Sequence, residues 1–80
     1  MVQDVVFKEI SRYLKCQPED ISMDMKLEEL GIDSLGAITI LYELEDELSI
    51  QVPDSVFDSL KIVKDIVDQL EMILDKNKSI

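Results

Sequence analysis

Apolar side chains recur at steps of three and four residues along three separate stretches of the chain. This spacing places them on one face of an α-helix. It predicts helices over residues 2–15, 34–48 and 61–74, with a short helical turn over residues 54–60 before the last of them. Pro18 and Pro53 interrupt the pattern because proline cannot donate a backbone hydrogen bond. No stretch alternates over the length of a strand, so we expect an all-α, four-helix bundle of three longer helices and one short helix, with a long first loop.

The length of the chain limits what it can contain. Its 80 residues suffice for one small core, so we expect a single domain over residues 1–80. The start of the chain, MVQDVVFKEI, mixes acids with short apolar pairs and contains neither a basic leader nor a continuous apolar run. Neither a signal peptide nor a membrane span is therefore indicated, and we expect a cytoplasmic or organelle-matrix protein.

The acidic charge is concentrated in the middle of the chain. Residues 27–60, here called the acidic segment, hold nine acids and no base, whereas the residues on either side are almost balanced. Such a surface repels nucleic-acid phosphates and anionic lipids, and it favours capture by a basic patch on a protein partner. A solubilising face is the simpler interpretation of the same pattern.

The residues of the first loop do not predict a metal site or a reactive thiol. The stretch DISMDMKLEELG is loosely similar to a calcium-binding loop, but Met25 occupies the required glycine position and Gly31 the position of the bidentate glutamate. Cys16 is the only cysteine of the chain and has no histidine partner. We interpret it as a small, partly buried apolar residue.

Ser34 of GIDSLG lies where the long loop gives way to the second helix. A catalytic serine needs a base, and the chain contains no histidine. The esterase pattern G-x-S-x-G also fails, because Ile32 occupies its first glycine position. Asp33 is better interpreted as a helix cap than as a proton acceptor. The helix start offers free backbone N–H groups suited to a phosphate, and a serine that simply caps the helix is the alternative.

The stretch LGIDSLGAITILYELEDELSIQVPD resembles the acyl carrier protein family, whose hallmark is a D-S-L triplet that opens an acid-rich second helix. The likeness extends over nearly the whole chain, because the first helix, the long loop, the second helix, the VPD turn and the last helix follow one another in the same order as in the family. It implies that Ser34 carries 4′-phosphopantetheine, transferred from coenzyme A by a separate phosphopantetheinyl transferase. The chain would then be a non-catalytic carrier that holds acyl intermediates as thioesters. It would shuttle them between enzymes of fatty acid, polyketide or related lipid biosynthesis.

The resemblance also implies two sets of contact residues. Acyl-loading, condensing or acyltransferase enzymes with basic patches would dock on Asp33, Leu35, Ile38, Tyr42, Glu45 and Asp46. A nonpolar acyl chain would fold back between the second and third helices against Leu44, Val52, Phe57 and Leu60, although these four residues are also ordinary candidates for the core.

Three positions depart from many fatty-acid carriers: those carriers often have methionine where Tyr42 stands, and they have acids on exposed early turns of the second helix. This chain has Gly36 and Thr39 there. A carrier for polyketide, lipid-modifying or aminoacyl chemistry therefore stays open beside a fatty-acid carrier. Two other classes remain as alternatives, an unmodified acidic adaptor and a hydrolase that uses Ser34, and the absence of histidine argues against the second.

Overall fold

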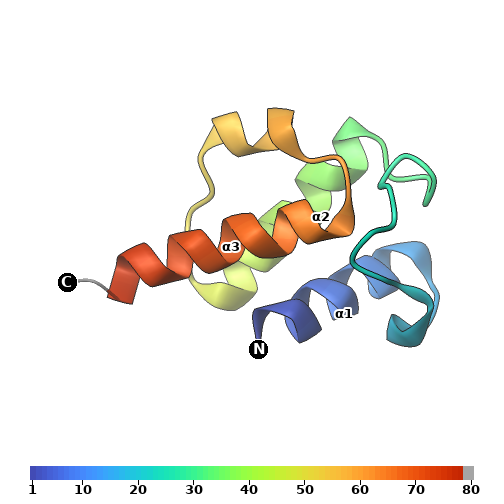
Figure 1. Cartoon of the computed structure of the whole chain (residues 1–80), viewed down its shortest axis with the longest axis horizontal. Helices are drawn as coiled ribbons and strands as arrows, with labels where there is room; N and C mark the ends of the chain where they lie inside the picture. The colour runs from blue at the N-terminus through green and yellow to red at the C-terminus, as the bar shows by residue number, and fades with distance from the viewer. Residues whose placement is uncertain (79–80) are drawn as a thin grey trace.

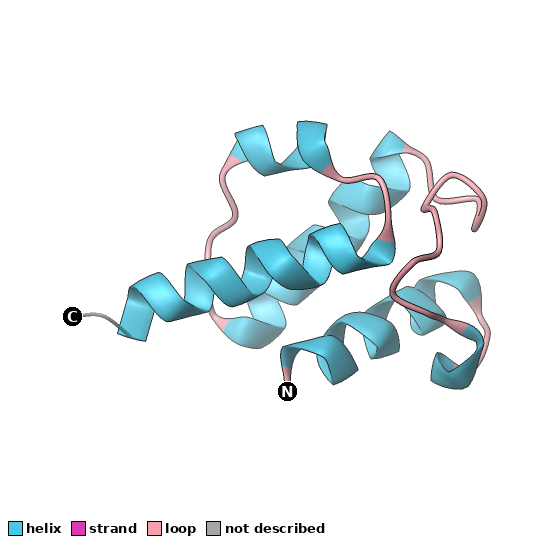
Figure 2. Ribbon diagram, viewed as in Figure 1, coloured by secondary structure: helices cyan, strands magenta, loops and turns pink. Residues whose placement is uncertain are grey.

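The computed structural model describes the backbone of residues 1–78 and the side chains of residues 1–76. Its elements follow one another as α1 (Val2–Leu14), η1 (Pro18–Asp20), α2 (Ser34–Leu48), η2 (Asp54–Ser59) and α3 (Val63–Lys78). Figure 2 shows helices joined by loops, and no strand occurs within residues 1–78. The predicted all-α fold of three longer helices and one short helix is confirmed. The short helix η2 is of the 3-10 type, and η1 is an additional 3-10 turn inside the first loop.

The three long helices enclose one apolar core. In Figure 1, α3 crosses in front of α2, and η2 lies across the far side of the bundle from α1. Helix α1 contacts both α2 and α3, while η2 contacts α2. The fully buried side chains that form the centre of the core come from all three long helices: Val6, Ile10, Ile40, Leu41, Leu44, Val63, Ile66, Val67 and Leu70. These residues include the three- and four-residue repeats seen in the sequence.

The first loop is held against the start of α3 by backbone hydrogen bonds. The Leu27 N–H donates to the Lys61 carbonyl over 2.9 Å, and the Val63 N–H donates to the Met25 carbonyl over 3.0 Å. Buried Ile21, Leu27 and Ile32 also anchor the loop in the core. Half-buried Cys16 packs on the same core, as expected for a small apolar residue. The loop that leads to the second helix is therefore fixed at several points.

Local backbone geometry sets where the helices end. Lys15 after α1 and Ser49 after α2 adopt left-handed conformations, with φ values of 60° and 56°. Such residues commonly terminate helices, because the left-handed turn lets nearby N–H groups satisfy the last carbonyls. The Ile50 N–H donates in this way to the Glu45 carbonyl over 3.1 Å. No helix within the described residues is long and apolar enough to cross a membrane.

Candidate functional site

Ser34 is the first residue of α2, and its side chain is exposed. The capping role belongs to Asp33, whose Oδ1 accepts a hydrogen bond from the Gly36 N–H over 2.8 Å. This decides between the two residues that the sequence left as possible caps. The Ser34 hydroxyl itself has no hydrogen-bond partner among the residues that the structure describes. It is therefore presented to solvent at the positive end of a helix without a role in holding that helix.

The residues on either side of Ser34 are tied down although the serine is exposed. Gly31 has a φ of 81°, in the left-handed region that favours glycine, and it completes the turn before the helix. The Ile32 N–H donates to the Leu27 carbonyl over 2.9 Å, and the Ile32 side chain is buried. An exposed hydroxyl thus stands on a backbone that is anchored immediately before it.

Gly36 does not lie on an exposed turn, and the sequence-based expectation for this position was wrong. The residue is buried because the side chain of Tyr13 from α1 covers it. A Cβ atom added at Gly36 would stand 2.6 Å from Tyr13 Oη, well inside van der Waals contact. The glycine therefore lets α1 approach the first turn of α2 closely, next to Ser34.

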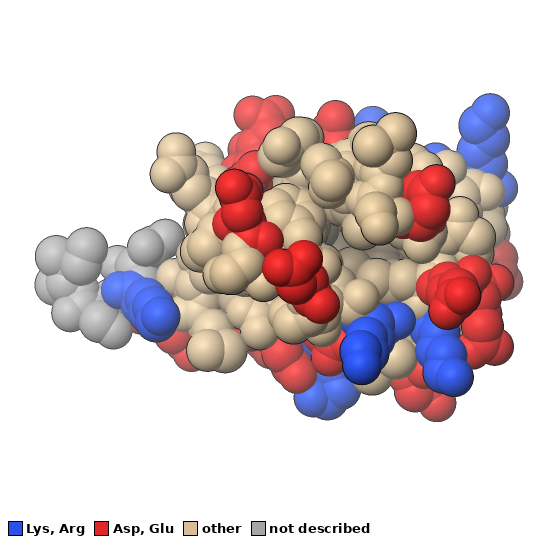
Figure 3. Space-filling view, turned by 90° about the horizontal axis from the view of Figure 1, so that it is seen from above, with Lys and Arg blue, Asp and Glu red and all other residues tan. Residues whose placement is uncertain are grey.

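A hollow of about 850 Å³ opens beside Ser34. It lies between α2, η2 and the paired segments before α3. Figure 3 shows the molecule from above, with a hollow that has both acidic and basic side chains around it. Its lining combines apolar side chains with charged ones: Lys26, Leu27, Glu28, Ile32, Asp33, Ser34, Ala37, Ile38, Phe57, Asp58, Leu60, Lys61 and Ile62. The site therefore joins an exposed hydroxyl to a space large enough for a small organic group.

The four residues expected to contact an acyl chain are not all placed together. Phe57 and Leu60 line the hollow beside Ser34 and are half-buried. Leu44 is fully buried in the core, and Val52 lines a separate hollow at the other end of α2. Ala37 and Ile38 also line the Ser34 hollow, although the sequence analysis assigned neither residue to it and expected Ile38 only in partner docking.

Three of the expected docking residues form an apolar strip on α2. Leu35 is 73% exposed and Tyr42 is 61% exposed, so both leave apolar area open to solvent on the same helix. Ile38 lies between them in sequence and is half-buried at the edge of the hollow. This strip begins directly after Ser34, so a protein that contacts it also reaches the hydroxyl.

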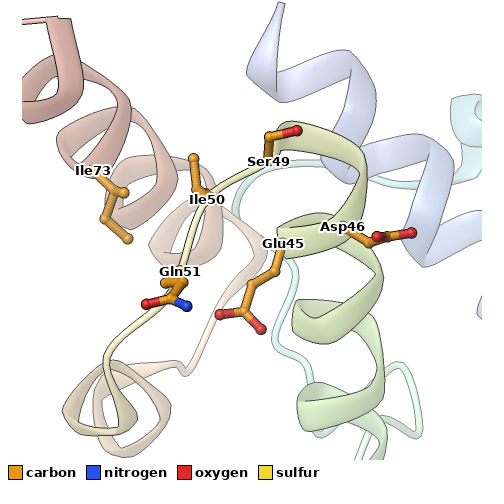
Figure 4. Close-up of a pocket in the computed structure, with 6 residues that line it drawn as sticks. All are labelled: Glu45, Asp46, Ser49, Ile50, Gln51 and Ile73. Carbon is orange, nitrogen blue, oxygen red and sulfur yellow. The ribbon is translucent and has the colours of Figure 1, made fainter.

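The two acidic docking candidates on α2 differ in their surroundings. The Val52 N–H donates a hydrogen bond to Glu45 Oε2, so Glu45 ties the end of α2 to the segment before η2. Figure 4 shows Glu45 pointing toward this segment and Asp46 pointing away from it. Both residues border a shallow hollow of about 450 Å³ together with Ser49, Ile50, Gln51 and Ile73. Asp46 is exposed, and it is the better candidate for a purely electrostatic contact.

A buried carboxyl group between α1 and α2 was missed by the sequence analysis. Glu9 is only 5% exposed, and Arg12 Nη1 lies 3.1 Å from its Oε1. Burial and a hydrogen bond with Glu47 raise the pKa of Glu9, while the nearby Arg12 partly opposes that change. The Lys8 ammonium pairs with Glu47 and lowers the pKa of Glu47. Glu9 lies three residues after Val6 and four after Val5, and this spacing places it on the apolar face of α1. That placement was the signal in the sequence that could have predicted its burial.

Comparisons with known proteins agree with this arrangement. The family described as "Phosphopantetheine attachment site" matches residues 4–70. An acyl carrier protein of Campylobacter hominis is 37% identical over 78 residues, covering 96% of this chain and 92% of that protein. An acyl carrier protein of Campylobacter curvus is 32% identical over 73 residues, covering 90% of each. The crystal structure of an acyl carrier protein from Thermotoga maritima has the same fold, with a TM-score of 0.71, 23% identity and coverage of 90% of this chain and 93% of that one.

The matched family and the helical fold define a phosphopantetheine-bearing carrier domain. The chain belongs to the acyl carrier protein family. It is accordingly a non-catalytic carrier, and its cofactor is covalently attached 4′-phosphopantetheine.

Proposed function

We propose that Ser34 is the attachment point of the phosphopantetheine arm and that the chain shuttles acyl thioesters between enzymes. The observation that supports this most strongly is that Asp33, and not the adjacent Ser34, caps the helix. Asp33 caps α2, so the exposed Ser34 hydroxyl is left without a structural hydrogen bond. Attachment of a bulky group to that oxygen therefore need not disturb the helix.

The attachment reaction requires a partner enzyme. The Ser34 oxygen would attack the phosphorus on the pantetheine side of the coenzyme A pyrophosphate and form a new O–P bond. The P–O bond to the bridging oxygen would break, and adenosine 3′,5′-bisphosphate would leave with that oxygen. The serine proton must pass to a base on the phosphopantetheinyl transferase, because this chain has no histidine to accept it. The same lack of a catalytic base suits a carrier, since a thioester on the arm must survive transit.

Docking would combine the apolar strip with nearby acidic charge. Leu35 and Tyr42 offer exposed apolar area, and Asp46 offers an exposed carboxylate one turn beyond Tyr42. A loading, condensing or acyltransferase enzyme with a basic patch would associate quickly and separate easily, because exposed charge pairs add rate and specificity more than affinity. Asp33 and Ile38 would lie at the centre of this contact beside the arm.

The hollow beside Ser34 would shelter part of the acyl group. Phe57 and Leu60 supply apolar walls, as do Ala37 and Ile38 on α2. Leu44 and Val52 would contribute from the core only if a longer chain separated the helices. We further propose that the 80 residues act as one cytoplasmic, monomeric domain serving fatty acid, polyketide or related lipid synthesis.

Intact mass spectrometry tests the carrier function. The chain is incubated with coenzyme A and a phosphopantetheinyl transferase of broad specificity. A gain of one phosphopantetheine unit, followed by acyl loading on its thiol, is the expected result. An unchanged mass would overturn the proposal and leave an unmodified acidic adaptor as the remaining function.

A further inference from the structure

Two lysines, Lys26 and Lys61, border the hollow beside Ser34. Lys26 immediately precedes the acidic segment and Lys61 immediately follows it, so they are far apart in sequence. Backbone pairing places their two segments side by side, because the Leu27 N–H donates to the Lys61 carbonyl over 2.9 Å and Lys26 is bridged to Ile62. Both lysines line the hollow that Ser34 also lines. One edge of the hollow therefore carries two basic side chains, although the acidic segment that supplies most of its lining contains no lysine or arginine.

Neither lysine is paired with an acid in the part of the chain that the structure describes. Three other basic side chains do form such pairs: Lys8 with Glu47, Arg12 with Glu9, and Lys64 with Asp68. Lys26 and Lys61 are both exposed and keep their ammonium groups available. An incoming anion would not have to displace an existing ion pair.

The acids of the hollow do not cancel this positive edge. Glu28, Asp33 and Asp58 also line it. Asp33 already accepts the Gly36 N–H, and no ion pair joins Glu28 or Asp58 to either lysine within the described residues. An anionic group inside the hollow would thus be repelled from the acidic walls and attracted to the lysine edge.

We propose that Lys26 and Lys61 form an anion-binding edge that holds an anionic oxygen group carried on the Ser34 arm. This inference rests on the proposed function, because the arm is what brings the anion to the hollow. Two groups of this chemistry come with an arm: the phosphodiester at Ser34, and the terminal carboxylate of a dicarboxylic acyl cargo. In the second case Phe57 and Leu60 would contact the methylene groups while the lysines bind the carboxylate. The edge would then distinguish a carboxylated cargo from a neutral acyl group of the same length.

NMR spectroscopy of the loaded protein tests this edge. The transferase attaches a glutaryl-phosphopantetheine arm with a ¹³C-labelled terminal carboxylate, or a pentanoyl arm of the same carbon number. If the edge binds the cargo, the pKa of the labelled carboxylate falls by about half a unit or more relative to glutaryl-coenzyme A. The double variant Lys26→Gln/Lys61→Gln removes that decrease, and Lys64→Gln retains it because Lys64 pairs with Asp68 outside the hollow.

The phosphorus resonance separates the two sources of the anion. If the edge binds the phosphodiester, the double variant shifts the ³¹P signal of both loaded forms, and the carboxylate pKa stays that of glutaryl-coenzyme A. If neither resonance differs between the wild type and the folded double variant, the anion-binding edge is refuted while the carrier function stands. If no arm is attached at all, the proposed function is refuted first, and the anion-binding edge fails with it.

Discussion

Gly36→Ala should reveal how closely α1 approaches the modification site. Alanine in place of glycine inside a helix gains about 1 kcal/mol in helix propensity. The new Cβ would stand 2.6 Å from Tyr13 Oη and 3.0 Å from Tyr13 Cζ, so the tyrosine must move. Forced repacking of this kind costs about 1–3 kcal/mol, although the 42% exposure of Tyr13 gives its ring room to swing outward. We therefore expect Gly36→Ala alone to be neutral or destabilising, by up to about 2 kcal/mol.

A double-mutant cycle isolates this contact. In a Tyr13→Ala background the obstruction is gone, and Gly36→Ala should stabilise the fold by about 1 kcal/mol. The free energy of unfolding of all four proteins is measured by urea denaturation, and a coupling of about 1–3 kcal/mol is expected between the two substitutions. Equal effects of Gly36→Ala in both backgrounds would refute the close approach of Tyr13 to the first turn of α2.

Four further predictions concern charged side chains. The pKa of Glu9 is raised above its ordinary value of 4.5, so the folded state holds the extra proton, and the contribution of Glu9 to stability should fall as pH rises above 4.5. Glu9→Gln should remove this decrease in urea denaturation at several pH values, and an unchanged profile would contradict it. Glu45→Ala should lower the free energy of unfolding by about 1–2 kcal/mol through the lost Val52 hydrogen bond. Asp46→Lys should change the free energy of unfolding by no more than about 0.5 kcal/mol, yet it should slow acyl transfer to partner enzymes at low salt. Equal transfer rates would show that Asp46 contributes to solubility and not to docking. Sodium chloride should raise the melting temperature by screening the nine acids of residues 27–60, and a melting temperature independent of salt would exclude repulsion among them.

The long helices could be predicted from the sequence because their apolar stripes and start and stop signals agree. The predicted bounds of the second helix coincide with Ser34–Leu48, where Asp33 provides the cap and Ser49 the left-handed end. The last helix runs from Val63 to Lys78 rather than over residues 61–74. Residues 61 and 62 instead take part in the pairing with the first loop, and such pairing between distant irregular segments leaves no periodic signal in a sequence.

The sequence predicted which residues form the centre of the candidate site, but it did not predict the contacts around them. The D-S-L triplet pointed to Ser34, and local capping rules pointed to Asp33. Three features join separate elements: the contact between Tyr13 and Gly36, the hydrogen bond from Val52 to Glu45, and the placement of Lys26 and Lys61 beside one hollow. Each depends on the tertiary packing of those elements, which spacing along one segment cannot show. For the same reason Leu44 proved to be a core residue although it shares a helix with the hollow's lining.

Peptide mapping of the modified protein tests the central claim most directly. After reaction with coenzyme A and the transferase, the arm should be found on Ser34, and Ser34→Ala should accept none. That variant should lose at most about 0.5 kcal/mol, because Asp33 already caps the helix, and it should remain helical by circular dichroism. Ser55→Ala, a change at an exposed serine of η2, should be modified like the wild type. An arm on another residue, or a folded Ser34→Ala protein that is still modified, would contradict the account.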